Sequence, residues 1–237
     1  MTILVSFVSL IAFLLVVLAG LLYKYGIIEL ATVFAGFKYG IFTAIAALVL
    51  LILQVIFKRK TLTLASVAIT VVLSMVAIGL PLSMLSKGKS VPAIHDISTD
   101  LINPPEFVAI APLRADAPNP VAYAGEATAA QQRQGYPELK TLSYSQSKAE
   151  LVSAVEQAAK NLGWELVNTD TSEGVVEATD TTAWFGFKDD VVIRITDNGN
   201  ERLLDIRSKS RVGGSDLGKN AERIHDFINE LDSILAK

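Results

Sequence analysis

The chain contains no cysteine, which excludes disulfides, thiolate catalysis and thiolate metal sites. It has two histidines, His95 and His225, so a single chain cannot supply a multi-histidine metal centre. The formal net charge is only -3, and no basic patch is large enough to hold a phosphate backbone. The sequence therefore predicts no metal, no cofactor and no nucleic-acid partner.

Charge is also scarce in the first third of the chain. Before Lys58 the charged side chains are Lys24, Glu29 and Lys38, and there are none from Thr61 to Leu85. An apolar run of about 20 residues forms a helix long enough to cross a bilayer. The sequence predicts a transmembrane region over 1–86, in contact with the lipid bilayer, with helices at about 3–23, 39–57 and 62–85.

The segment 24–38 lies between the first two predicted spans and is too short to cross. Its apolar residues recur at helical spacing, so it is either an interfacial helix or tight re-entrant turn, or a loop pressed against the bilayer. Lys58, Arg59 and Lys60 follow the second span, and the positive-inside rule puts them in the cytoplasm. The N-terminus is then cytoplasmic, and the C-terminal domain faces the periplasm across an inner (plasma) membrane. Lys87 and Lys89 on the outer side oppose this assignment.

Seven of the eight prolines lie between Pro92 and Pro137. Because proline removes a backbone donor and breaks helices and central strands, we expect an extended, mostly irregular linker over 87–140. Within it, residues 91–100 alternate apolar and polar side chains, and this stretch is expected to pair as an added strand or to pack on the membrane region.

A soluble α+β domain is predicted over 141–237. Ser147 and Glu150 form a capping box that opens a helix, and a second helix closes the chain from about Asp216. Between them lie four predicted strands, and a turn at Asp197–Asn200 makes the last two a hairpin. The predicted fold class is a membrane-anchored α+β protein, with a four-stranded antiparallel sheet and both helices on one face. The four strands are Trp164–Asn168, Gly174–Asp180, Asp190–Asp197 and Arg202–Ser208.

Alternation along the hairpin puts Asp190, Arg194 and Arg207 on the second face of the sheet. Two interpretations are open: cross-strand ion pairs on a solvated face, or an open platform for a partner. Asp189 and Asp190 are neighbours on a strand and point to opposite faces, so they are not expected to form an acid/base or metal pair.

Three further motifs are candidate binding sites. Trp184, Phe185 and Phe187 surround a glycine, as in a packed core or edge, or in a contact with a ligand or membrane. The stretch from Arg207 to Gly218 is a basic, glycine-rich loop that opens a helix, so it either binds an anion or is capped by Asp216. His95 and Asp96 resemble a base and its orienting acid, without a serine or cysteine elbow. The candidate loop residues are Arg207, Ser208, Ser210, Arg211, Ser215 and Asp216.

Several of these segments resemble the family known as domain of unknown function 1499. The matching pieces lie within residues 92–235 and imply a shared fold there, but no activity, substrate or cofactor. They are His95–Asp100, Pro104–Pro105, Gly163–Trp164, Glu177–Thr179, Trp184–Arg194 and Arg207–Ile224.

Three functional hypotheses follow. The leading one is a non-enzymatic envelope module that binds a membrane-protein partner or a lipid-like or anionic ligand, because no catalytic constellation is complete. The second is a hydrolase or transferase, in which Asp189 or Asp190 acts with His95 while Arg194, Arg207 and Arg211 hold an anionic substrate. The third is a structural subunit of a larger membrane complex.

Overall fold

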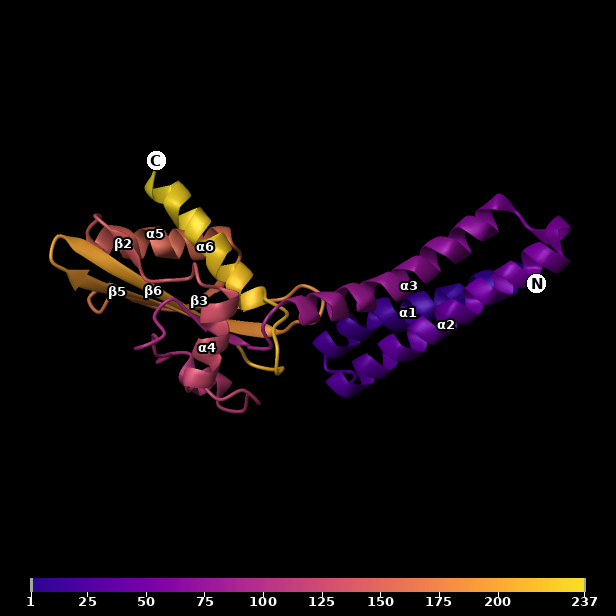
Figure 1. Cartoon of the computed structure of the whole chain (residues 1–237). Coiled ribbons are helices and arrows are strands. Elements are labelled where there is room, and N and C mark those ends of the chain that lie inside the picture. The colour runs from indigo at the N-terminus through magenta and orange to yellow at the C-terminus, as the bar shows by residue number, and fades with distance from the viewer. Residues whose placement is uncertain (1, 237) are drawn as a thin grey trace. The chain divides into compact units, whose positions relative to one another are not determined.

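The computed structural model describes residues 2–236 and divides them into two compact units (Figure 1). Unit 1 contains the chain up to Ser86 together with Ala183–Gly186. Unit 2 contains Lys87–Thr182 and the chain from Phe187 onward.

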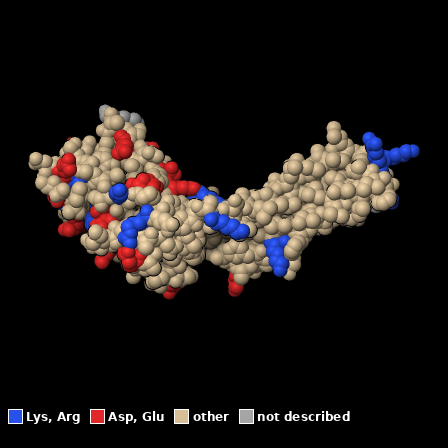
Figure 2. Space-filling model, in the orientation of Figure 1, with Lys and Arg blue, Asp and Glu red and all other residues tan. Residues whose placement is uncertain are grey.

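Unit 1 is built from three long apolar helices, α1 (Thr2–Lys24), α2 (Leu30–Phe57) and α3 (Leu64–Ser90), the last of which continues into unit 2. Each is long and apolar enough to cross a membrane, as predicted. On the face drawn in Figure 2, this unit shows almost no charge except toward its ends. The 24–38 segment contains no separate interfacial helix: α1 ends at Lys24, a tight turn follows over residues 25–29, and α2 begins at Leu30.

Small residues bring α1 and α2 into close contact. A Cβ atom added at Gly40 would lie 2.5 Å from Val16 Cγ2 and 3.2 Å from the Ala12 carbonyl oxygen. One turn earlier, a Cβ at Gly36 would lie 3.0 Å from the Leu15 carbonyl oxygen. Glycines at this spacing let two backbones approach, which is how helices associate in a medium that offers no hydrophobic driving force.

Unit 2 is an α+β fold around an antiparallel sheet of six strands, not four. The strands run in the order β1-β6-β5-β4-β3, and β2 pairs with a separate stretch of β6. β1 is the added strand that the alternation over residues 91–100 allowed, whereas β2, only three residues long, was not predicted; both pair with β6. The bounds are β1 Asp96–Ser98, β2 Leu142–Tyr144, β3 Glu165–Asp170, β4 Val175–Thr181, β5 Lys188–Asn198 and β6 Glu201–Ser210.

The main core lies between one face of the sheet and two helices, α5 (Lys148–Asn161) and α6 (Lys219–Leu235), which lie on the same side of it (Figure 1). The predicted capping box opens α5, where Ser147 and Glu150 bond each other's backbone N–H. Apolar residues of β5 and β6 alternate into this core, among them Ile193, Ile195, Leu204 and Ile206.

The opposite face of the sheet is covered by residues 99–125, here called the covering segment. Phe107 and Ile110 of this segment pack on Val192 in a smaller apolar cluster. Instead of an extended connector throughout, the proline-rich region contains β1, a 3-10 turn η2 (Ala111–Arg114) and α4 (Glu126–Gly135). From α4, Gln132 bonds both the N–H and the carbonyl oxygen of Ser98 in β1.

Candidate functional site

The charged face predicted from the hairpin exists, but it is neither solvated nor open. Cross-strand register aligns Thr179, Asp190 and Lys209 in one row, and Glu177, Val192 and Arg207 in the next. All six side chains are buried, because the covering segment lies over them. This face, together with the covering segment, forms the candidate site.

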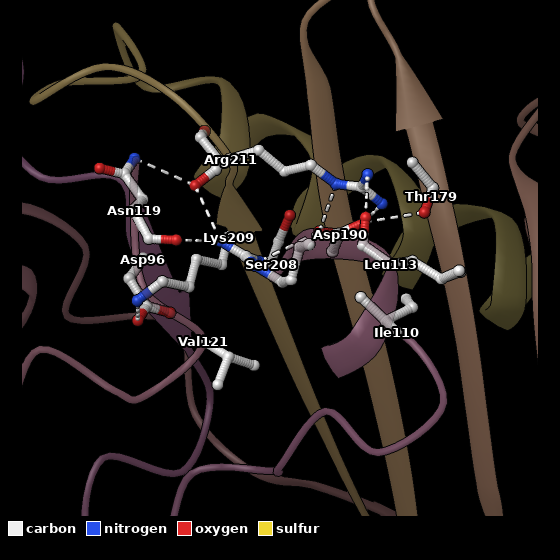
Figure 3. Close-up of polar contacts among 12 residues, drawn as sticks. Asp96, Ile110, Leu113, Asn119, Val121, Thr179, Asp190, Ser208, Lys209 and Arg211 are labelled. Atoms are coloured by element: carbon white, nitrogen blue, oxygen red, sulfur yellow. Dashed lines mark hydrogen bonds and ion pairs between the residues drawn. The ribbon is translucent and has the colours of Figure 1, made fainter. Parts of the chain in front are cut away.

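Asp96 is the centre of a first buried cluster (Figure 3). Its carboxylate accepts hydrogen bonds from Arg207 Nε and Nη2, both at 2.9 Å, and from Lys209 Nζ at 2.7 Å. The rings of Phe107 and Tyr123 stack on the Arg207 guanidinium, with centroids 5.0 and 5.3 Å from its Cζ. Two cations therefore share one fully buried carboxylate.

Asp190 is the centre of a second cluster, in which one buried carboxylate is again shared by two cations. Arg211 donates to it from Nε at 2.9 Å and Nη2 at 2.8 Å, and Arg114 donates from Nη1 at 3.1 Å. Thr179 Oγ1 donates at 2.8 Å. Asp189, the neighbour of Asp190, instead accepts from Arg223 at 2.6 Å, as alternation predicted.

Main-chain carbonyl oxygens of the covering segment accept further hydrogen bonds from the cations of both clusters. Arg207 donates to the carbonyl oxygens of Pro105 and Val121, and Lys209 donates to that of Ala122. Arg211 donates to the Leu113 carbonyl oxygen at 3.0 Å. The spacing of Arg207, Lys209 and Arg211, at the end of β6 and just after it, thus directs three cations to the covering segment. Carbonyl dipoles of that segment offset the positive charge that the two carboxylates do not neutralise.

Glu177 also attaches the covering segment to the sheet, but it accepts hydrogen bonds from the segment, whereas the cations donate them. Its carboxylate is fully buried and accepts the backbone N–H groups of Val108, Ala109 and Ile110 at 2.8–3.0 Å. Nearer the hairpin turn, Arg194 bridges Asp100 of the covering segment and Asp205 of β6. The segment is therefore fixed to the sheet by charged side chains along its length.

Burial perturbs the titrating groups of this site. Desolvation lowers the pKa of Lys209, although the adjacent Asp96 carboxylate acts in the other direction. Desolvation likewise lowers the pKa of Arg114, opposed by Asp190. Burial, reinforced by Asp96, raises the pKa of Tyr123 to about 12, so the phenol stays neutral at physiological pH.

The loop candidates are distributed over a polar cluster at the start of α6. Asn220 accepts from Ser208 Oγ at 2.6 Å and donates to Ser210 Oγ at 2.9 Å, and Arg223 Nη1 donates to Ser208 Oγ at 3.1 Å. Asp216 accepts the backbone N–H groups of Gly218 and Asn220, which is the capping alternative. Burial raises its pKa. Ser215 Oγ accepts the Leu217 N–H.

Trp184 and Phe185 belong to unit 1. Trp184 Nε1 donates to the Val17 carbonyl oxygen at 2.9 Å, and its ring stacks on Phe37 with centroids 6.0 Å apart. Phe185 is buried, and its ring meets Phe37 edge-on. Lys24 Nζ bonds the Ala183 carbonyl oxygen. These aromatics are packed among helix residues, whereas Phe187 lies in unit 2 and its backbone pairs with Thr182 at the base of the loop.

The structure does not bring His95 together with Asp190. The hydrogen-bond partners of the Asp190 carboxylate, among residues 2–236, are Arg114, Arg211 and Thr179. His95 precedes β1, and its carbonyl oxygen accepts the Ser210 N–H. Within the same range, no three acidic or histidine side chains are arranged to hold a metal ion.

Sequence reasoning missed four residues of the network: Lys209, Arg114, Glu177 and Asn119. Lys209 lies two residues from Arg207 and from Arg211, so the same period of two could have placed it on their face of the sheet. Arg114 is the only basic residue of the covering segment, and Glu177 the only acidic one in Val175–Thr179; isolated charges in apolar surroundings are the signal that was present. Asn119 bonds Ser210 and Gly213, and nothing local marks it.

The sequence model of the family described as "Protein of unknown function (DUF1499)" matches residues 96–231. The chain belongs to this family. The match begins at Asp96, includes the covering segment and every strand, and ends within α6. No curated protein matches the chain significantly. Membership of DUF1499 thus applies to the sheet, its helices and the buried network together.

Proposed function

We propose that this DUF1499 protein is a non-enzymatic, membrane-anchored module of the cell envelope that binds another membrane protein. The observation that carries the proposal is the internal use of charge. Asp96, Asp190, Arg207 and Arg211 were candidates for binding an anion or moving a proton, and each is engaged by other side chains or by the covering segment. A network of this kind fixes a surface rather than exposing reactive groups.

Native mass spectrometry of the full-length chain in mild detergent tests this function. We expect an additional polypeptide, retained at low activation energy. A small bound mass that an Arg211→Ala variant loses would favour the lipid-like or anionic ligand instead. Bare protein in detergent and in native-membrane nanodiscs would contradict binding of any stable partner.

We further propose that unit 2 faces the periplasm and that Lys58–Lys60 face the cytoplasm, because the basic cluster follows the second apolar helix. The chain lacks cysteine, so a single introduced cysteine is the only thiol that a maleimide can label in it. An impermeant maleimide should label Asn198→Cys in cells whose outer membrane alone is permeabilised, and Arg59→Cys only after lysis. The reverse pattern would invert the topology.

A further inference from the structure

The covering segment carries the exposed large aliphatic side chains of unit 2. From Lys87 onward, the large hydrophobic residues classed as exposed among those described are Ile102, Val108, Leu113 and Val121, at 97, 70, 58 and 37%. Single exposed aliphatics are ordinary on protein surfaces. In this unit, however, all four belong to the covering segment, and this confinement singles out that segment.

The backbone of each of these four residues is held by a charged side chain. The Ile102 N–H bonds Asp100, which pairs with Arg194, and the Val108 N–H bonds Glu177. The carbonyl oxygen of Leu113 accepts from Arg211, and that of Val121 accepts from Arg207. The main chain is fixed inward while the aliphatic side chains are directed to solvent.

Such an arrangement holds the four aliphatic side chains in one fixed orientation, although the backbone that carries them is irregular. Buried ion pairs contribute little net stability compared with well-packed apolar residues, and specificity of conformation is one use that retains them. A surface already fixed before binding avoids the entropy cost of ordering a loop in the complex.

The charge of the segment indicates what it binds. Its exposed charged side chains, Glu106 and Asp116, are acidic, and Arg114 is buried. Anionic lipid headgroups would be repelled, whereas a protein surface bearing lysine or arginine would be attracted.

We propose that residues 102–121 are the docking surface for a protein partner that presents apolar pockets rimmed by basic side chains. This inference rests on the proposed function and names its surface. Ile102, Val108, Leu113 and Val121 are the anchors, and Glu106 and Asp116 pair with the basic rim.

Site-specific photo-crosslinking of the full-length chain in its native membranes tests the surface. Benzoylphenylalanine at Val108 or Leu113 should give one discrete adduct, whose crosslinked peptide contains Lys or Arg beside apolar residues. The same probe at Asn198, in the β5–β6 turn, is the matched exposed control. A Glu106→Lys/Asp116→Lys double variant should reduce the adduct about tenfold or more, because like charges then face each other.

Three outcomes would overturn the docking surface: adducts to lipid, adducts to a second copy of this chain, or adducts no stronger than at Asn198. If native mass spectrometry still shows a bound polypeptide in the charge-reversed variant, the proposed function stands and this surface is wrong. If neither experiment detects a partner, both are wrong.

Discussion

Asp96→Ala should destabilise unit 2 by about 3–5 kcal/mol, since removing one member of a buried ion cluster leaves uncompensated charge. Asp96 is fully buried and holds Arg207 and Lys209 together. Without it, two cations face each other beneath the covering segment and keep only carbonyl oxygens as hydrogen-bond acceptors. The loss should appear in urea unfolding of the detergent-solubilised chain, followed by pulsed hydrogen exchange in peptides from β5 and β6.

Asp197→Ala is the matched control. Asp197 also pairs with one lysine and one arginine, Lys148 and Arg202, but its side chain is 57% exposed. An exposed pair contributes about 1 kcal/mol or less, so this variant should unfold almost as the parent does. Equal losses at Asp96 and Asp197 would show that burial of the first cluster has no energetic consequence.

Gly40→Leu should separate α1 from α2. The Cβ atom alone would lie 2.5 Å from Val16 Cγ2, and the remaining leucine atoms have no space between the two helices. Overpacking typically costs about 1–3 kcal/mol, and in lipid the glycine contact is itself the source of association. The heat-induced loss of the monodisperse elution peak in size-exclusion chromatography should occur at lower temperature.

Gly79→Leu in α3 is the control for that variant, because a Cβ at Gly79 meets no atom within 4 Å. The two substitutions change helix propensity and hydropathy equally. If Gly79→Leu lowers the temperature at which the elution peak is lost as much as Gly40→Leu does, close packing at Gly40 is not what holds α1 and α2 together.

Periodicity was a sound guide wherever elements were long. The apolar runs predicted three helices, and alternation in β5 predicted that Asp189 and Asp190 point apart, which their separate arginine partners confirm. Boundaries were less accurate: α2 begins at Leu30 rather than near residue 39, because its first turns carry Lys38 and small residues that lower local hydropathy.

The covering segment was beyond such reasoning. Its proline content correctly indicated irregular backbone, but its attachment depends on side chains bonding main-chain atoms far away in sequence. Glu177 bonds the Val108 N–H, and Arg207 bonds the Pro105 carbonyl oxygen. Carbonyl acceptors carry no residue identity, so no sequence pattern records them. The charged face was therefore expected to be solvated or open, whereas in the structure it is buried beneath the covering segment.

Hydrogen exchange of the full-length chain in nanodiscs tests the attachment of the covering segment most directly. Val108, Ala109 and Ile110 donate their N–H groups to one buried carboxylate, so these amides should exchange nearly as slowly as those of β5. A Glu177→Gln variant should speed their exchange much more than that of β5. Exchange of these three amides at the rate of an unstructured peptide in the parent chain would contradict the account, because the segment would then be unattached.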